Sequence, residues 1–133
     1  MEDSTPAHLI KSISPDEISR SILTVRGEHV LLSQQLAKLY SVEVRALNQT
    51  VKRNPNYFCE NSFFQLSVSE FRDAYFLATT VSWIMVNRAR PYAFTIDAII
   101  PLQWLLKKHG SDELNFAMVQ AFVNKKERLR SRR

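Results

Sequence analysis

The chain has 133 residues, of which 45% are hydrophobic and only two are glycine. This size and apolar content predict one globular domain, and so few glycines argue against glycine-rich phosphate loops and against an all-β fold full of tight turns. The formal net charge of +5 and the isoelectric point near 9.6 suit a polyanionic partner.

The N-terminal part predicts a tail, a short helix and a hairpin. Residues 1–13 are expected to form a flexible tail. The run Ser14-Pro15-Asp16-Glu17 matches a capping box with proline at the first helical position. Strands are then expected at 22–25 and 29–32, joined by a turn at Arg26-Gly27-Glu28. Arg26 fits a phosphate contact and fits an ordinary turn residue equally well.

Residues 33–54 predict two short helices joined by a tight turn. We expect Ser33 to cap the first helix, because its hydroxyl can accept from the amides of the opening turn. Each helix carries one apolar stripe at helical spacing, which predicts burial. The stripes are Leu36, Leu39 and Tyr40 in the first helix and Val44, Leu47 and Val51 in the second. Pro55 should end the second helix near Asn54.

The opposite face of the second helix is polar and basic. It consists of Arg45, Asn48, Gln49, Lys52 and Arg53. Arginine fits a guanine edge or a phosphate, asparagine and glutamine can pair with adenine, and lysine usually contacts phosphate. Such a face behind a helix and a turn is typical of a helix-turn-helix unit that enters DNA. Most amphipathic helices also have a solvated charged face that binds nothing, so the pattern alone leaves both interpretations open.

The middle of the chain predicts a strand at 61–67, a helix from Ser67 or Ser69 to about Leu77, and two strands at 82–86 and 90–94. A hairpin of the last two strands would form a wing, with Arg88 and Arg90 near its tip. Those arginines would contact the DNA backbone or the minor groove. The alternative is a pair of exposed loop arginines with no ligand.

Two helices are expected in the C-terminal part. Thr95 should cap the first, which is apolar nearly all round and which Pro101 should kink or shift; it is a core helix or part of a dimer interface. Ser111 should cap the last helix, whose apolar face is Leu114, Ala117, Met118, Ala121 and Phe122. We place the domain at 14–124 and a basic tail at 125–133, either an exposed DNA-binding arm or the link to a further domain.

Catalytic and metal-binding patterns are absent from the sequence. The three histidines lie far apart, no histidine or cysteine pair has metal-ligand spacing, and no nucleophile elbow, Walker loop or dinucleotide fingerprint occurs. The single cysteine, Cys59, suits a reducing compartment. The N-terminus lacks the apolar core of a signal peptide, and the apolar run 74–86 is too short to span a bilayer. We therefore expect a cytoplasmic protein that is not an enzyme, has no cofactor, metal or membrane contact, and binds a polyanion.

Several motifs together resemble one family, the phage antirepressor-type N-terminal DNA-binding domain called the ORF-six-N domain, a relative of the KilA-N domain. The motifs are Arg26-Gly27, Leu36-Ala37-x-Leu39-Tyr40, Leu47-Asn48, Lys52-Arg53-Asn54, Phe63-Phe64-Gln65-Leu66 and Pro91-Tyr92-Ala93-Phe94-Thr95. The resemblance extends from about residue 12 to 122. The chain departs from the family pattern at Ser41, where glycine is usual, at Cys59, at Ile96 and at Pro101.

The resemblance and the residue pattern together predict an α+β fold, a winged-type helix-turn-helix with small antiparallel strands and C-terminal helices. They imply the DNA-binding domain of a phage- or prophage-derived regulator, antirepressor-like, that reads double-stranded DNA with the helix Glu43–Asn54 near the host nucleoid. The alternative is a protein-interaction module that contacts a repressor or another regulator without reading DNA. A homodimer also stays open.

Overall fold

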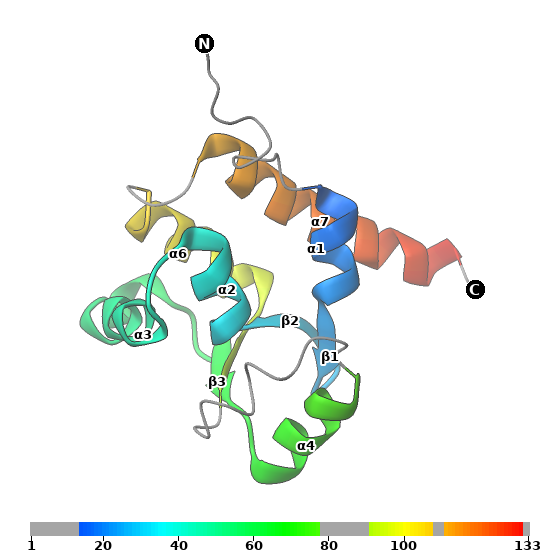
Figure 1. The fold of residues 1–133 in the computed structure, drawn as a ribbon, viewed down its shortest axis with the longest axis horizontal. Helices are drawn as coiled ribbons and strands as arrows, with labels where there is room; N and C mark the ends of the chain where they lie inside the picture. The colour runs from blue at the N-terminus through cyan, green and yellow to red at the C-terminus, as the bar shows by residue number, and fades with distance from the viewer. Residues whose placement is uncertain (1–13, 78–90, 108–110, 132–133) are drawn as a thin grey trace.

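The computed structural model describes residues 14–77, 91–107 and 111–131 and has an α+β fold (Figure 1). Four short strands form one antiparallel sheet, and helices cover both of its faces. The expected tail at 1–13 and the expected strand at 82–86 lie outside the described residues. The predicted combination of small antiparallel strands with several helices is confirmed.

The N-terminal helix and hairpin form where the sequence predicted them. Helix α1 (Pro15–Ser21) opens with a capping box, in which the Ser14 hydroxyl accepts from the Asp16 amide at 3.1 Å. Strands β1 (Leu23–Val25) and β2 (Glu28–Leu32) pair in antiparallel register. Arg26 and Gly27 join them with φ angles of 56° and 76°. Two consecutive positive φ angles match the twist of a two-residue hairpin turn.

Helices α2 (Ser33–Tyr40) and α3 (Val44–Arg53) follow β2 directly. The prediction that Ser33 caps α2 is wrong, because the N-cap position belongs to Leu32. The Gln35 side chain accepts from the Leu32 amide at 2.7 Å. The Ser33 hydroxyl instead accepts from the Tyr92 amide at 3.2 Å. A bond to a distant strand thus replaces the local cap and ties α2 to the sheet.

Strands β3 (Phe63–Gln65) and β4 (Tyr92–Phe94) complete the sheet in the order β1-β2-β4-β3. In β4, Ala93 and Phe94 pair with β2 on one side and with β3 on the other. The hairpin expected between 82–86 and 90–94 therefore cannot include these two residues. Residues 82–90 of the expected hairpin lie outside the described part of the chain.

The two faces of the sheet belong to separate apolar clusters. Residues alternate along β2 and β4, so that Leu31 and Phe94 face the larger cluster while Val30 and Ala93 face the smaller one. The larger cluster joins the sheet to α1, α2, α3, α6 (Ile96–Leu105) and α7 (Asp112–Ser131). The smaller one joins it to Phe71 of α4 (Val68–Leu77). Helix α3 therefore sits at the edge of the main core (Figure 1).

The C-terminal helices close the core. Helix α6 starts after Thr95, as expected, and continues through Pro101. Thr95 Oγ1 donates to the Ser62 carbonyl at 2.8 Å and makes no cap bond. Ser111 Oγ does cap α7, accepting from the Leu114 amide at 2.9 Å, and the five predicted apolar residues of α7 are all buried. Helix α7 extends to Ser131, so no helix boundary separates the predicted basic tail from the domain.

Candidate nucleic-acid interface

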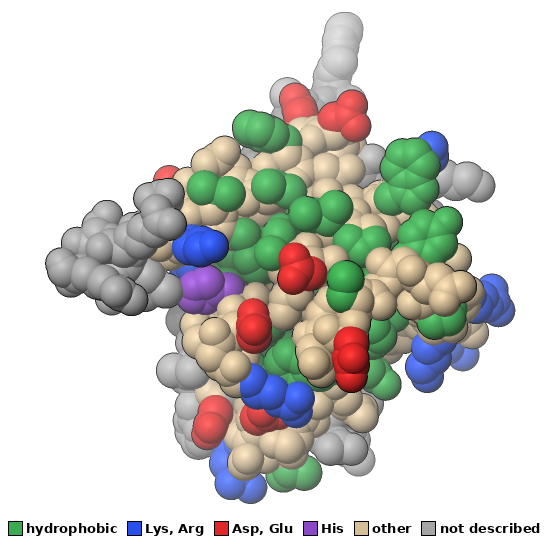
Figure 2. Space-filling view, turned by 180° about the vertical axis from the view of Figure 1, so that it is seen from behind, with side chains coloured by type: hydrophobic (Ala, Val, Ile, Leu, Met, Phe, Trp, Pro, Cys, Tyr) green, Lys and Arg blue, Asp and Glu red, His purple; other side chains and the backbone are tan. Residues whose placement is uncertain are grey.

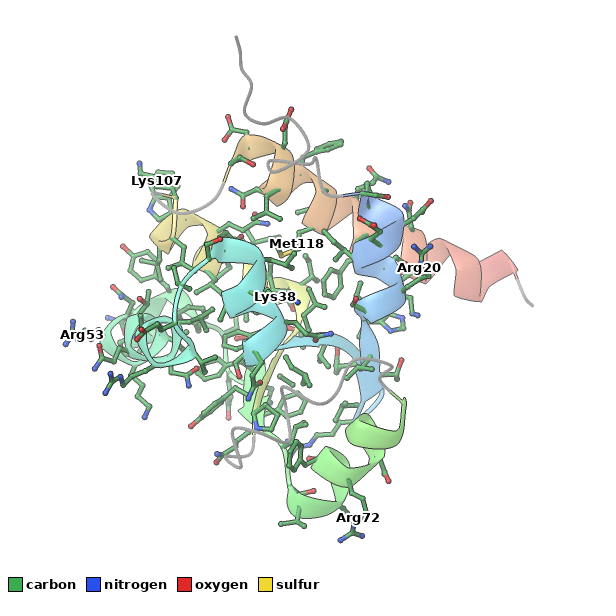
Figure 3. The ribbon with its side chains drawn as sticks, viewed as in Figure 1. Arg20, Lys38, Arg53, Arg72, Lys107 and Met118 are labelled. Atoms are coloured by element: carbon green, nitrogen blue, oxygen red, sulfur yellow. The ribbon has the colours of Figure 1, made fainter. Side chains whose placement is uncertain are left out.

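Helix α3 is held by one side and exposed on the other. Leu47 is fully buried and Val51 is 4% exposed, both within the main core, and Val44 packs at its margin. This confirms the predicted inner stripe. The opposite side carries four exposed side chains: Arg45, Gln49, Lys52 and Arg53. Figure 3 shows Arg53 directed away from the body of the molecule.

The turn between α2 and α3 is short and closely fixed. Ser41 has φ 58° and ψ 43°, the left-handed conformation in which glycine is usual. The Val42 amide donates to the Ala37 carbonyl at 2.9 Å and the Ser41 amide to the Lys38 carbonyl at 3.2 Å. These bonds satisfy two of the last four carbonyls of α2. The chain can therefore reverse direction within three residues and start α3 at Val44.

A second set of contacts ends α3 where its basic residues lie. The Asn54 side chain donates to the Thr50 carbonyl at 2.8 Å, and Pro55 opens a short 3-10 turn, η1 (Pro55–Tyr57). The end predicted from Pro55 is thus confirmed. Lys52 and Arg53 occupy the last turn, where positive charge is favoured by the helix dipole.

Asn48 differs from the other residues of the predicted surface, because it is half-buried. It lines a hollow of about 220 Å³ together with Val51 and Lys52 of α3 and the rings of Phe63, Tyr92 and Phe94. Phe63 stacks on Phe94 with 5.6 Å between ring centroids. Aromatic rings of β3 and β4 therefore lie across this hollow from Asn48 and Lys52.

A shallow groove of about 600 Å³ runs along the junction of α2 and α3. Lys38, Glu43 and Arg45 line it, together with apolar residues of the turn. Glu43 is the N-cap residue of α3, and its carboxylate lies in the groove with the two cations Lys38 and Arg45. The cations of the α3 surface thus continue onto α2.

The Arg26 guanidinium forms an ion pair and a ring contact within the protein. Its Nε donates to Glu70 Oε2 at 2.7 Å and its Nη2 to Glu70 Oε1 at 3.0 Å, while the guanidinium lies 4.1 Å from the centroid of Phe64. The Arg26 guanidinium lowers the pKa of the Glu70 carboxyl from 4.5 to about 2, helped by the Ser67 amide. These contacts give Arg26 a structural role at the turn between β1 and β2.

The structure thus brings together five of the seven predicted contact residues, Arg45, Asn48, Gln49, Lys52 and Arg53, on one helix. Arg88 and Arg90 lie outside the described residues. The sequence analysis did not place the aromatic rings of β3 and β4 beside Asn48. The signal for this placement was the alternation of aromatic residues in Phe63-Phe64-Gln65 and Tyr92-Ala93-Phe94, which places Phe63, Tyr92 and Phe94 on one face of the sheet.

No group of three or more histidine, cysteine or acidic side chains that could hold a metal ion occurs within the described residues. A search of the same residues for a helix long and apolar enough to cross a membrane also found none. Cys59 is exposed and forms no disulfide.

A family model described as the ORF6N domain matches residues 20–99, more than half of the chain. The matched segment includes the whole sheet, both helices α2 and α3, and the turn between them. Neither the comparison with curated proteins nor that with solved structures produced a match.

Proposed function

The chain belongs to the ORF6N domain family, and we propose that it binds duplex DNA. In this proposal α2 and α3 form a winged-type helix-turn-helix, and α3 is the recognition helix. The proposal makes it the DNA-binding part of a phage- or prophage-derived regulator, antirepressor-like, that acts on the host nucleoid in the cytoplasm. Double-stranded DNA is its ligand, and a repressor or another regulator is a second candidate partner.

The observation that carries the proposal is the free basic side of α3. Arg45, Lys52 and Arg53 are exposed, and within the described residues none of them forms an ion pair. Unpaired cations keep their full attraction for phosphate, because no carboxylate must be displaced before they bind. The same side carries the amides of Asn48 and Gln49, which can read adenine.

The residues divide into two roles. Arg45, Asn48 and Gln49 stand within one turn of each other and would reach base edges, whereas Lys52 and Arg53 at the end of α3 would contact phosphates. Arg88 and Arg90 would supply the wing contacts, from the segment that precedes β4. Binding would therefore combine a sequence-dependent part with a salt-dependent part.

Selection of bound duplexes from a random pool, followed by titration of a selected duplex at several salt concentrations, tests the proposal. We expect an enriched sequence and an affinity that falls steeply with salt. The triple variant Arg45→Ala, Lys52→Ala, Arg53→Ala should lose binding. Arg20→Ala, Arg72→Ala is the control, because these exposed arginines of α1 and α4 lie on other elements (Figure 3).

Two results would count against DNA reading. If no duplex is enriched and the wild-type protein binds DNA no better than the triple variant, α3 is not a recognition helix. If the wild-type protein binds a regulator protein and the triple variant does not, α3 is instead a protein-binding surface.

A further inference from the structure

Helix α7 carries an apolar stripe that the fold leaves uncovered. Its inner side packs against α1 and the core, with Leu114, Ala117, Met118, Ala121 and Phe122 buried. On the outer side Phe116 is 69% exposed and Val123 is 45% exposed, with the half-buried Val119 and Gln120 between them. The spacing of three and four residues places these four side chains along one line of the helix.

Helix α6 adds two large side chains to the same surface. Ile100 is 52% exposed and Trp104 is 64% exposed, one helical turn apart. Gln103 of α6 donates to the Asn115 carbonyl of α7 at 3.1 Å, which fixes the two helices at one end. At the other end Ile96 shares a hollow of about 580 Å³ with Val119 and Val123. The two outer stripes therefore run side by side.

This surface, formed by Ile100, Trp104, Phe116, Val119, Gln120 and Val123, is called the α6/α7 face below. Figure 2 shows hydrophobic side chains gathered across the back of the molecule, where α6 and α7 lie. Among the residues whose side-chain burial the structure gives, two other large hydrophobic side chains are exposed, Tyr57 and Val68, and they lie on η1 and α4. Clustered exposed apolar residues of this kind mark association surfaces.

The charges at the two ends of α7 are opposite in sign. Asp112 and Glu113 occupy the first turn, and Lys125 and Lys126 lie near the other end of the outer stripe. Glu113 and Lys126 are equally far in sequence from the midpoint between Val119 and Gln120, and so are Phe116 and Val123. Two copies of α7 packed antiparallel about that midpoint would therefore place Phe116 against Val123 and Glu113 against Lys126, twice each.

We propose that the α6/α7 face binds a second copy of this chain in a two-fold symmetric dimer with antiparallel α7 helices. An interface of this kind requires a surface that is complementary to itself, which the acidic and basic ends of α7 and its apolar residues Phe116, Val119 and Val123 provide. Trp104 lies at the edge of the stripe, 4.6 Å from the Lys107 ammonium, and extends the buried area. The dimer does not depend on DNA binding, because it uses α6 and α7 and leaves the outer side of α3 exposed.

Sedimentation of the whole chain without DNA, over a range of protein concentrations, tests the proposal. We expect the wild-type protein to dimerise, and Phe116→Ser to raise the dissociation constant about tenfold or more, as the loss of a central aromatic contact does. Val68→Ser is the matched control: Val68 is 60% exposed on α4, outside the α6/α7 face, and its loss should leave the dissociation constant unchanged. Circular dichroism checks that each variant is folded.

A charge reversal tests the antiparallel arrangement. Glu113→Lys or Lys126→Glu alone should each weaken the dimer about tenfold, because each replaces two symmetry-related attractions by two repulsions. The double variant should restore wild-type dimerisation, since both pairs become attractive again. A wild-type protein that stays monomeric up to about 1 mM, or a dimer that Phe116→Ser does not weaken, would overturn the proposal. A double variant without restored association would overturn the antiparallel pairing.

Discussion

Arg26 and the cations of α3 are alike in the sequence, since each is a basic residue that fits a phosphate contact. In the structure their surroundings differ. The Arg26 guanidinium donates from Nε and Nη2 to both oxygens of Glu70 and lies on the ring of Phe64. Arg45, Lys52 and Arg53 have no such carboxylate among the described residues. One arginine holds the β1–β2 hairpin against α4, whereas the others are left free for a ligand.

The difference is caused by a residue far away in the sequence. Glu70 lies 44 residues after Arg26 and is oriented by the Ser67 amide, which donates to Oε1 at 2.8 Å. The sequence near an arginine therefore does not show whether the fold brings a carboxylate to it. Mutations can separate the paired cation from the unpaired ones, and they can also test the docking of α3 on which the unpaired cations depend.

The largest expected effect concerns the buried side of α3. Leu47→Ala should lower the free energy of unfolding by about 2–5 kcal/mol, because it removes a fully buried leucine and leaves a cavity. Chemical denaturation measures this change. Gln49→Ala, on the exposed side of the same helix, should cost little. Equal stability of both variants would mean that α3 does not dock on the core through Leu47.

Next in size is the effect of the amide that lies between the two sides of α3. Asn48→Ala should weaken binding to a selected duplex by about 1–3 kcal/mol and relax the sequence preference, because an asparagine amide can pair with adenine. Competition between the selected duplex and a scrambled one measures both changes. If the variant still discriminates as well as the wild type, Asn48 supports the helix and does not read bases.

A smaller effect separates the unpaired cations from the paired one directly. Lys52→Ala should weaken binding to all duplexes and reduce the slope of log affinity against log salt by roughly one unit, which corresponds to one lost phosphate contact. Arg26→Ala removes the same charge from the hairpin and should leave the slope unchanged. A matching loss of slope in both variants would mean that Arg26 also contacts DNA.

The smallest expected effect is a pH dependence of stability at Glu70. Its pKa is lowered from 4.5 to about 2, so the pair with Arg26 stabilises the fold above pH 4.5, and this contribution is lost as the pH falls toward 2. Since half of the Arg26 side chain is exposed, the contribution is small. Thermal melts of the wild type and Glu70→Gln should differ slightly at neutral pH and converge near pH 2. A difference that persists at pH 2 would assign the effect to packing.

Local patterns predicted most of the elements correctly. The capping box at Ser14, a turn that includes Arg26 and Gly27, the inner stripes of α2, α3 and α7 and the end of α3 before Pro55 all depend on residues close together in sequence. These features follow from helical spacing, from caps and from the restricted geometry before proline, and nothing distant changed them. The predicted turn was one residue too long, because Glu28 already pairs with Val25 in the sheet.

The features that sequence reasoning missed are contacts between distant segments. Ser33 has the side chain of a helix cap, yet its hydroxyl accepts from Tyr92, 59 residues later. Asn48 lines a hollow with the rings of Phe63, Tyr92 and Phe94. These rings meet on one face of the sheet only in the strand order β1-β2-β4-β3. Local spacing carries no information about that order. The residues of the candidate surface on α3 could therefore be predicted from the sequence. The partial burial of Asn48 and the aromatic rings beside it could not.

The central position of β4 also governs how the sheet can assemble. Strands β2 and β3 do not pair with each other, and both gain their inner partner only when Tyr92–Phe94 arrives between them. During synthesis the chain therefore passes through a stage in which two strand edges are open, and such edges template aggregation. Joining segments this distant is also a slow kind of contact to form. A nascent chain that stalls before β4 is consequently the form of this protein that most needs protection by a chaperone.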